Sequence, residues 1–496
     1  MPTVPLPDNP SLEQLRKQAK DLRDQARAGV DDALDLVAAH HPSGAHPLTL
    51  TGAQLVLARC HGFASWAQLK RYLEMIERYR RTPDEVDEGA DPAGQFLALA
   101  CLRYGEDDHP TRWERAARLL AQHPDLAGSN IFVAAATADE AAIAGIVGAD
   151  PGAAAREGGP HDWQPILYLA YARHDPELTE EATLGAARLL LRYGADANAG
   201  YLWHGLGPGF TALTGALGGG ESDQPPHPHG YALASLLLEA GADPNDSQAL
   251  YNRQFGSDDG HLILLLEKGL GRGDGGPWRR RLGPMADSPS ELVRIQLWWA
   301  IVHGMTERVK LLVEHDADFL SPFGSPSGPG WAGGSDGRSP AEVAALNGSP
   351  ELCEWLVERG APRPRGTGVD GLIAAAMAGD RAKVARRSGH IEAARAERPA
   401  LIVWAAARGA RDAVALLAEI GFDVNALGRG DVPMEQQWET ALHRAAASGD
   451  VELARLLLDL GAEPTITDAR FHSTPLGWAR HFGHPAIVEL LQPRTP

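Results

Sequence analysis

The strongest constraint on this chain is a motif that recurs at a fixed spacing near its C-terminal end. The sequence TALHRAAASGDVELARLLL begins at Thr440, and TPLGWARHFGHPAIVELL begins at Thr474, 34 residues further along. A repeat of that length is one supersecondary unit, which buries its apolar face only by stacking on its neighbours. The spacing therefore predicts a stack of small units and not one large core.

Each unit has the pattern of two antiparallel helices. Thr440 is placed to cap the first helix, because its hydroxyl can accept a hydrogen bond from a free backbone N–H. Leu442 and Ala445 give that helix a narrow apolar face, and Gly449 ends it, where a positive φ is needed. The run from Val451 to Leu458 predicts a second, more apolar helix.

The same pattern occurs upstream. Near copies of the second helix and its turn lie at residues 187–198, 233–245, 309–318, 351–361 and 414–425, and weaker units lie around 96–126, 131–154, 250–269 and 372–397. In these residues the chain resembles the ankyrin-repeat family. The resemblance implies an all-α solenoid of about ten or eleven helix-pair repeats with long hairpin insertions, starting near residue 93.

Residues 1–82 differ from the repeats. Signals of the type Ser/Thr-x-x-Gln, which mark helix starts, begin at Ser11, Thr51 and Ser65. They predict a small helical module, which resembles the N-terminal leader of many bacterial ankyrin proteins.

Two breaks are expected in the array. The acidic stretch at residues 82–92 is expected to link the module to the repeats. A segment rich in Gly and Pro near 269–289 is expected to divide the repeats into two arcs, at 93–272 and 289–496.

Composition narrows the function. The net charge of −19 argues against general nucleic-acid binding, which needs a basic surface. Cys60, Cys101 and Cys353 are far apart, so neither a disulfide framework nor a zinc site is indicated. The N-terminal residues lack a signal-peptide pattern, and no apolar run approaches the length of a membrane span. We therefore expect a monomeric cytoplasmic protein without a cofactor or a membrane partner.

Long insertions interrupt the repeats where ankyrin hairpins would lie, at residues 199–210, 218–230, 319–338 and 427–439. Hairpins and first helices line the concave face of such arrays, and aromatic side chains are favoured anchors at interfaces. The alternative is that these rings fold back onto their own loops. The predicted binding residues are Tyr201, Trp203, His204, Phe210, Trp331 and Trp438.

The sequence gives little support for a catalytic site or a metal site. His227 and His229, with Glu221 and Asp223, have metal-ligand side chains, but a solvated, mobile loop is the preferred interpretation. The glycines at 205–209 match neither a Walker motif nor a dinucleotide fingerprint. Neither a nucleophile elbow nor an HExxH motif occurs, so we predict no catalytic residue.

These observations favour a binding protein that holds a protein or peptide partner in the concave groove. Whether the chain is an enzyme stays open, and a binding role is preferred. The main alternative is a small-molecule binder or unusual enzyme, with a pocket roofed by the insertions at 199–230 and 319–338. A third possibility is that the N-terminal module binds its own partner and the repeats act as a spacer.

Overall fold

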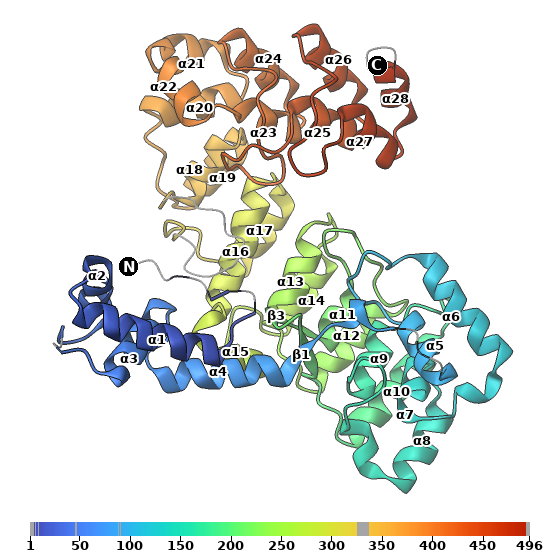
Figure 1. Ribbon diagram of the computed structural model, residues 1–496. Coiled ribbons are helices and arrows are strands. Elements are labelled where there is room, and N and C mark those ends of the chain that lie inside the picture. Colours follow the sequence, from blue (N-terminus) through green and yellow to red (C-terminus); the bar gives the residue numbers. More distant parts are fainter. Residues whose placement is uncertain are drawn as a thin grey trace. The chain divides into compact units, whose positions relative to one another are not determined.

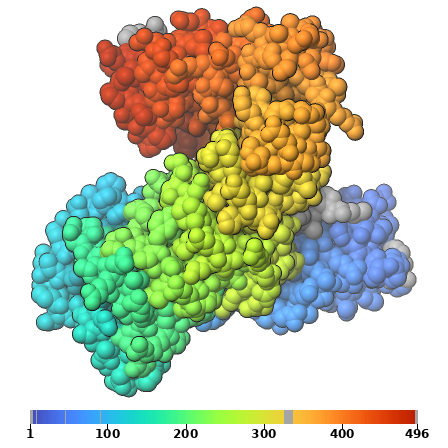
Figure 2. Space-filling model, turned by 180° about the vertical axis from the view of Figure 1, so that it is seen from behind, coloured from blue at the N-terminus to red at the C-terminus, as the bar shows by residue number. Residues whose placement is uncertain are grey.

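The computed structural model describes residues 4, 6–7, 9–44, 47–87, 89, 91–324 and 337–492. Within these ranges the chain is mostly helical (Figure 1). Contacts divide it into two compact units, unit 1 and unit 2, and the division falls between Val293 and Arg294. Colour follows the sequence, so unit 1 runs from blue to yellow-green and unit 2 from yellow to red (Figure 2). In the described ranges, no helix is long and apolar enough to span a bilayer.

Unit 1 begins with four helices that pack together within residues 1–82, and we call this part the module. They are α1 (Leu12–Arg27), α2 (Asp31–His40), α3 (Leu50–Cys60) and α4 (Trp66–Tyr79). Their apolar faces meet in one core that contains Leu15, Val37, Val56 and Leu69, each at most 2 % exposed. The burial of these side chains is the main force that holds such short helices together.

The capping signals mostly agree with the structure. Ser11 accepts a hydrogen bond from the amide of Gln14, and Ser65 does the same for Gln68, as predicted. The predicted start at Thr51 is wrong by two residues. Thr49 caps α3 instead, because its hydroxyl accepts from the amide of Gly52 (3.0 Å).

Successive helix pairs follow in unit 1. They are α5 (Pro92–Ala100) with α6 (Pro110–Gln122), α7 (Ile131–Ala136) with α8 (Glu140–Ala149), α9 (Pro165–Tyr171) with α10 (Glu180–Arg192), α11 (Ala212–Leu217) with α12 (Gly230–Glu239), and α13 (Ser247–Gln254) with α14 (Gly260–Glu267). The first helices of neighbouring pairs pack side by side from α5 to α13. The chain thus stacks helix pairs, as the periodicity predicts.

A small sheet departs from the all-α prediction. Strands β2 (Gly200–Trp203) and β3 (Leu206–Thr211) form an antiparallel hairpin, and β1 (Arg80–Arg81) pairs with β2 in parallel. The predicted break near 269–289 contains helix α15 (Gly276–Leu282), which packs against α4 and β3. The N-terminal module is therefore joined to the helix pairs through strands and α15.

In unit 2 the helix pairs continue after α16 (Pro289–Val302), which spans the division. The further helices are α17 (Thr306–Glu314), α18 (Pro340–Leu346), α19 (Pro350–Glu358), α20 (Gly368–Met377), α21 (Arg381–Arg386), α22 (Ile391–Glu397), α23 (Leu401–Ala407), α24 (Arg411–Glu419), α25 (Ala441–Ser448), α26 (Val451–Asp459), α27 (Pro475–His481) and α28 (Pro485–Leu491). The first helices α23, α25 and α27 pack side by side, and so do the second helices α24, α26 and α28.

The clearest repeat folds as its sequence predicts. Thr440 caps α25 in a capping box with His443, and Gly449 ends α25 with a φ of 71°. His443 also bonds to the carbonyl of Ser473 (2.9 Å), so its imidazole ties two neighbouring turns together. Its role is structural.

Candidate functional site

The hairpin of β2 and β3 carries four of the predicted binding residues, and two of them lie in the core. Tyr201 is 1 % exposed and Phe210 is 9 % exposed. The Tyr201 ring stacks on Trp163 at 5.0 Å and on Phe210 at 5.6 Å between centroids. These rings pack against the chain itself and offer almost no surface to a partner.

The other two residues of the hairpin connect it to neighbouring segments of unit 1. The half-buried Trp203 indole donates to the carbonyl of Arg103 (3.3 Å). His204 Nε2 lies 2.9 Å from a carboxylate oxygen of Asp84. Asp84 lies in the short turn Pro83–Glu85, within the stretch expected to be a plain linker. All four side chains of the hairpin thus contact other segments of unit 1.

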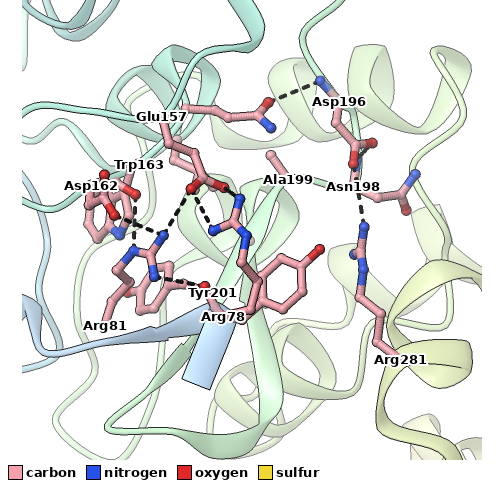
Figure 3. A pocket seen from close by; sticks show the side chains of 14 residues that line it. Arg78, Arg81, Glu157, Asp162, Trp163, Asp196, Asn198, Ala199, Tyr201 and Arg281 are labelled. Atoms are coloured by element: carbon pink, nitrogen blue, oxygen red, sulfur yellow. Dashed lines mark hydrogen bonds and ion pairs between the residues drawn. The ribbon is translucent and has the colours of Figure 1, made fainter. Parts of the chain in front are cut away.

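Arginines of the module face a carboxylate of the helix pairs beside this hairpin (Figure 3). Glu157 accepts two hydrogen bonds from Arg78, at 2.7 and 3.0 Å, and one from Arg81 at 3.0 Å. The hydrogen bond to Glu157 raises the pKa of Arg78 above its ordinary value. Arg81 also donates to the backbone carbonyl of Asp162 at 3.0 Å. This network attaches the end of α4 to the loop before α9.

A third arginine completes the attachment. The guanidinium of Arg281, from α15, lies over the rings of Tyr79 (5.0 Å) and Trp278 (4.9 Å). The Trp278 indole donates to the carbonyl of Asn198 (3.0 Å). Cation–π contacts of this kind contribute about 0.5–2 kcal/mol each, and more when they are shielded from water.

These side chains line a polar cavity of about 120 Å³. Its charges are balanced, because Arg78, Arg81 and Arg281 face Glu157, Asp162 and Asp196. Small-molecule pockets typically enclose roughly 300–1,000 Å³ and are mostly apolar. The cavity is therefore better described as an ion-paired joint than as a ligand site.

The insertion at 218–230 is partly buried: Glu221 and Asp223 are exposed, as expected of a solvated loop, whereas His227 is not. His227 is 1 % exposed, and its amide donates to the carbonyl of Ala216 (3.0 Å). Burial lowers the pKa of His227 to about 3, so the imidazole is neutral. Nowhere in the described ranges do His, Cys, Asp and Glu side chains form a group suited to a metal.

A different arrangement surrounds Trp438 in unit 2. The guanidinium groups of Arg429 and Arg470 both lie over its half-buried indole, 5.0 and 4.9 Å from the ring centroid. Arg470 also lies over Phe471 (5.1 Å), and the amide of Ala469 donates to the carbonyl of Trp438 (2.7 Å). The insertion at 427–439 is thereby held to the turn that precedes α27.

The stack continues onto α27. The Phe471 and Phe482 rings lie 6.3 and 6.1 Å from the buried Trp478 ring. Together these side chains form what we call the aromatic–arginine ladder: Arg429, Trp438, Arg470, Phe471, Trp478 and Phe482.

The ladder is held in place and is partly open to solvent. Asp468, which is 1 % exposed, accepts from the Trp478 indole and from the amide of Ser473, both at 3.0 Å. Phe471 is 61 % exposed and Phe482 is 50 % exposed. Exposed apolar side chains that cluster together are typical of interaction surfaces, whereas single ones are common on any protein. Among the described residues, no carboxylate lies within ion-pair distance of the Arg470 guanidinium.

The sequence prediction found only part of this surface. It named Trp438, whereas Arg470, Phe471 and Phe482 were missed, although Phe471 lies only three residues before the Thr474 motif. Trp331 lies outside the residues that the structure describes, as does most of the insertion at 319–338. The structure thus brings Tyr201, Trp203, His204 and Phe210 together in unit 1 and places Trp438 in a separate arrangement.

A comparison with protein families identifies the region around the ladder. A family model of ankyrin repeats, comprising three copies, matches residues 372–468 and, in an overlapping match, residues 402–495. The helix pairs α23–α24, α25–α26 and α27–α28 lie inside the matched residues, and the helix pairs of unit 1 lie outside them. The chain therefore carries ankyrin repeats in its C-terminal region, over residues 372–495.

Proposed function

We propose that this protein binds a protein or peptide partner through the aromatic–arginine ladder of its C-terminal ankyrin repeats. Ankyrin repeats in general bind proteins, and the observation that carries this proposal is the pair of exposed, fixed rings of Phe471 and Phe482. Aromatic residues and arginine are enriched among the residues that dominate binding energy at interfaces.

The ladder also indicates the chemistry of the partner. The Arg470 guanidinium is held between Trp438 and Phe471, and its charge is not neutralised by a neighbouring carboxylate of the described chain. A partner segment with an apolar side chain next to an acidic one would fill the exposed rings and pair with this charge. We therefore expect an acidic–apolar segment as the ligand.

Peptide selection tests the proposal. A display library of random linear peptides is selected against the full chain, and the enriched peptides are measured against the double variant Phe471→Ala/Phe482→Ala. The control is Ile263→Ala/Leu206→Ala, which removes two other exposed apolar side chains (43 % and 42 % exposed) from unit 1. We expect the ladder variant alone to lose at least about tenfold in affinity. Peptides that bind both variants equally well, or a library that shows no enrichment, would count against the proposal.

We also propose that the chain is organised as a module (1–82) followed by two arcs of repeats (93–272 and 289–496). The alternative function is a small-molecule site beneath the insertions at 199–230 and 319–338. Residues 199–211 pack within unit 1, and the cavity beside them is small and ion-paired.

A further inference from the structure

The insertion at 427–439 closes on itself as a hairpin, which we call the finger (residues 428–439). The amide of Gly428 donates to the carbonyl of Glu439 (2.8 Å), and the amide of Glu439 donates back to Gly428 (3.0 Å). The amide of Gly430 also donates to the Glu439 carboxylate (2.8 Å). The base of the finger is therefore fixed, and its tip, Asp431–Glu435, extends away from it.

The tip lies against residues that are distant in sequence within unit 2. The carbonyl of Asp431 lies 2.9 Å from Nε2 of His303, which follows α16. Val432 is only 2 % exposed. Met434, two residues further along, is 44 % exposed, so the tip lies at the surface with the Val432 side chain buried.

The end of the tip makes the charged contact. The Glu435 carboxylate accepts from Nε of Arg398 (2.6 Å) and from the amide of Ala400 (3.3 Å). Arg398 also donates to the carbonyl of Pro433 (3.3 Å). Its side chain is 20 % exposed and that of Glu435 is 29 % exposed, so this ion pair is partly shielded from water.

His303 is held rigidly for its contact with the tip. Its ring stacks on Trp299 at 3.8 Å between centroids and meets Trp404 edge-on at 5.9 Å. The Trp404 indole in turn donates to the side chain of Asn347 (2.7 Å). The residues that receive the tip are thus positioned by packing that does not involve the finger.

These contacts have the form by which a protein holds a short peptide segment. Backbone carbonyls are bound by side-chain N–H groups, one apolar side chain is buried, and one carboxylate meets a guanidinium. We propose that the surface around His303, Arg398 and the Ala400 amide is a second docking site. Its ligand is a peptide segment of a partner protein with an apolar residue three positions before an acidic one, and the finger tip occupies that site in the free chain.

The occupant follows from charge and from the finger itself. The guanidinium of Arg398 is complementary to a carboxylate, and the spacing from Val432 to Glu435 gives the spacing that the site accepts. Because the tip is held by surface hydrogen bonds, one ion pair and the single buried side chain of Val432, a partner segment that makes the same contacts can replace it. The base of the finger carries the ladder residues Arg429 and Trp438, but the docking site around His303, Arg398 and Ala400 includes no ladder residue, so the two proposals can fail separately.

Binding in trans tests the proposal. In a finger-shortened variant, residues 430–437 are replaced by Asn-Gly, which suits a tight turn between strands already paired at Gly428 and Glu439. The probe is a fluorescent synthetic peptide with the sequence RGDVPMEQQ, and its control has Ser and Gln in place of the Val and the Glu. We expect the shortened variant to bind the probe at least about tenfold more tightly than the full chain does. Arg398→Ala in the shortened variant should abolish that gain, whereas Phe471→Ala/Phe482→Ala should not.

A second variant provides an independent test in case the shortened variant does not fold. Val432→Ser/Glu435→Gln keeps the finger at full length but removes its buried and charged contacts, and it should also bind the probe more tightly than the unaltered chain. Circular dichroism and thermal melting verify that both variants are folded. Equal binding of the probe by folded variants and the unaltered chain would overturn the proposal, as would equal binding of the probe and its control peptide.

Discussion

Arg78 and Arg81 contact the same carboxylate and should nevertheless differ in their contribution to the joint between the module and the helix pairs. The Arg78 side chain is 56 % exposed and contacts Glu157, whereas that of Arg81 is 13 % exposed. Arg81 donates to Glu157 and also to the carbonyls of Arg78, Arg80 and Asp162, at 2.8 to 3.1 Å. The buried arginine therefore satisfies more acceptors.

These contacts set the expected magnitudes. An exposed ion pair contributes about 0.2–1 kcal/mol, which is the expected loss for Arg78→Ala. Arg81→Ala removes several charge-assisted hydrogen bonds from a shielded position, so we expect a loss of about 2–4 kcal/mol. The difference of roughly 2 kcal/mol corresponds to about a thirtyfold difference in the local opening equilibrium.

Hydrogen exchange is the suitable assay, because a chain with two compact units need not unfold in a single transition. The reporter is the amide of His204, which donates to the backbone carbonyl of Arg81 (2.8 Å), a bond that neither substitution removes. Arg81→Ala should accelerate its exchange about thirtyfold more than Arg78→Ala does. Equal acceleration by the two variants, or greater acceleration by Arg78→Ala, would refute the reasoning.

Three further predictions concern stability. Burial, reinforced by the charge of Asp431 and opposed by Arg444, raises the pKa of Glu439 to about 7. The folded state therefore binds this proton more tightly than the unfolded state, and stability falls as the pH rises from about 4 to 7. Glu439→Gln should raise the melting temperature of unit 2 more at about pH 8 than at about pH 5, and an equal gain at both would contradict this. Burial lowers the pKa of His161 and of His227 to about 3, so unit 1 should lose stability as the pH falls from about 6.5. With Gln at both positions, the free energy of unfolding measured in urea should fall less steeply as the pH decreases. An unchanged pH dependence would show that these two histidines do not cause the loss. A Cβ at Gly209 would lie 2.6 Å from the Trp278 ring, so Gly209→Ala should destabilise the joint by about 1–3 kcal/mol. Gly145→Ala should instead stabilise the chain by about 0.5–1 kcal/mol, because Gly145 lies in α8 and no atom beyond its own helix lies within 4 Å of the new Cβ. Thermal melting should show a lower melting temperature for Gly209→Ala and a higher one for Gly145→Ala, and the opposite order would contradict this.

The sequence predicted those features that rest on local physical rules. The 34-residue spacing from Thr440 to Thr474 predicted stacked helix pairs, because each pair has the same apolar face to bury. Ser11 and Ser65 predicted helix starts, because a hydroxyl at that position satisfies a free amide wherever the helix lies in the fold. The two-residue displacement at Thr51 arose because Thr49 offers the same hydroxyl two residues earlier.

Features that depend on distant contacts could not be predicted in this way. Tyr201 and Phe210 have the same residue types whether they face a partner or stack on Trp163, and only the fold decides between these outcomes. The strand at Arg80–Arg81 is too short to have a periodicity of its own, and it exists because β2 lies beside it. The exposure of Phe471 likewise follows from the course of its turn around Asp468 and not from its neighbours in sequence.

The central prediction is that a partner contacts the ladder of unit 2 and not the β2–β3 hairpin of unit 1. A photo-crosslinking amino acid placed at Phe471 or at Leu206, both well exposed (61 % and 42 %), tests this directly with a selected peptide. We expect the peptide to crosslink to position 471 and not to position 206. Crosslinking at position 206 alone would contradict the account and would restore the β2–β3 hairpin as the binding surface.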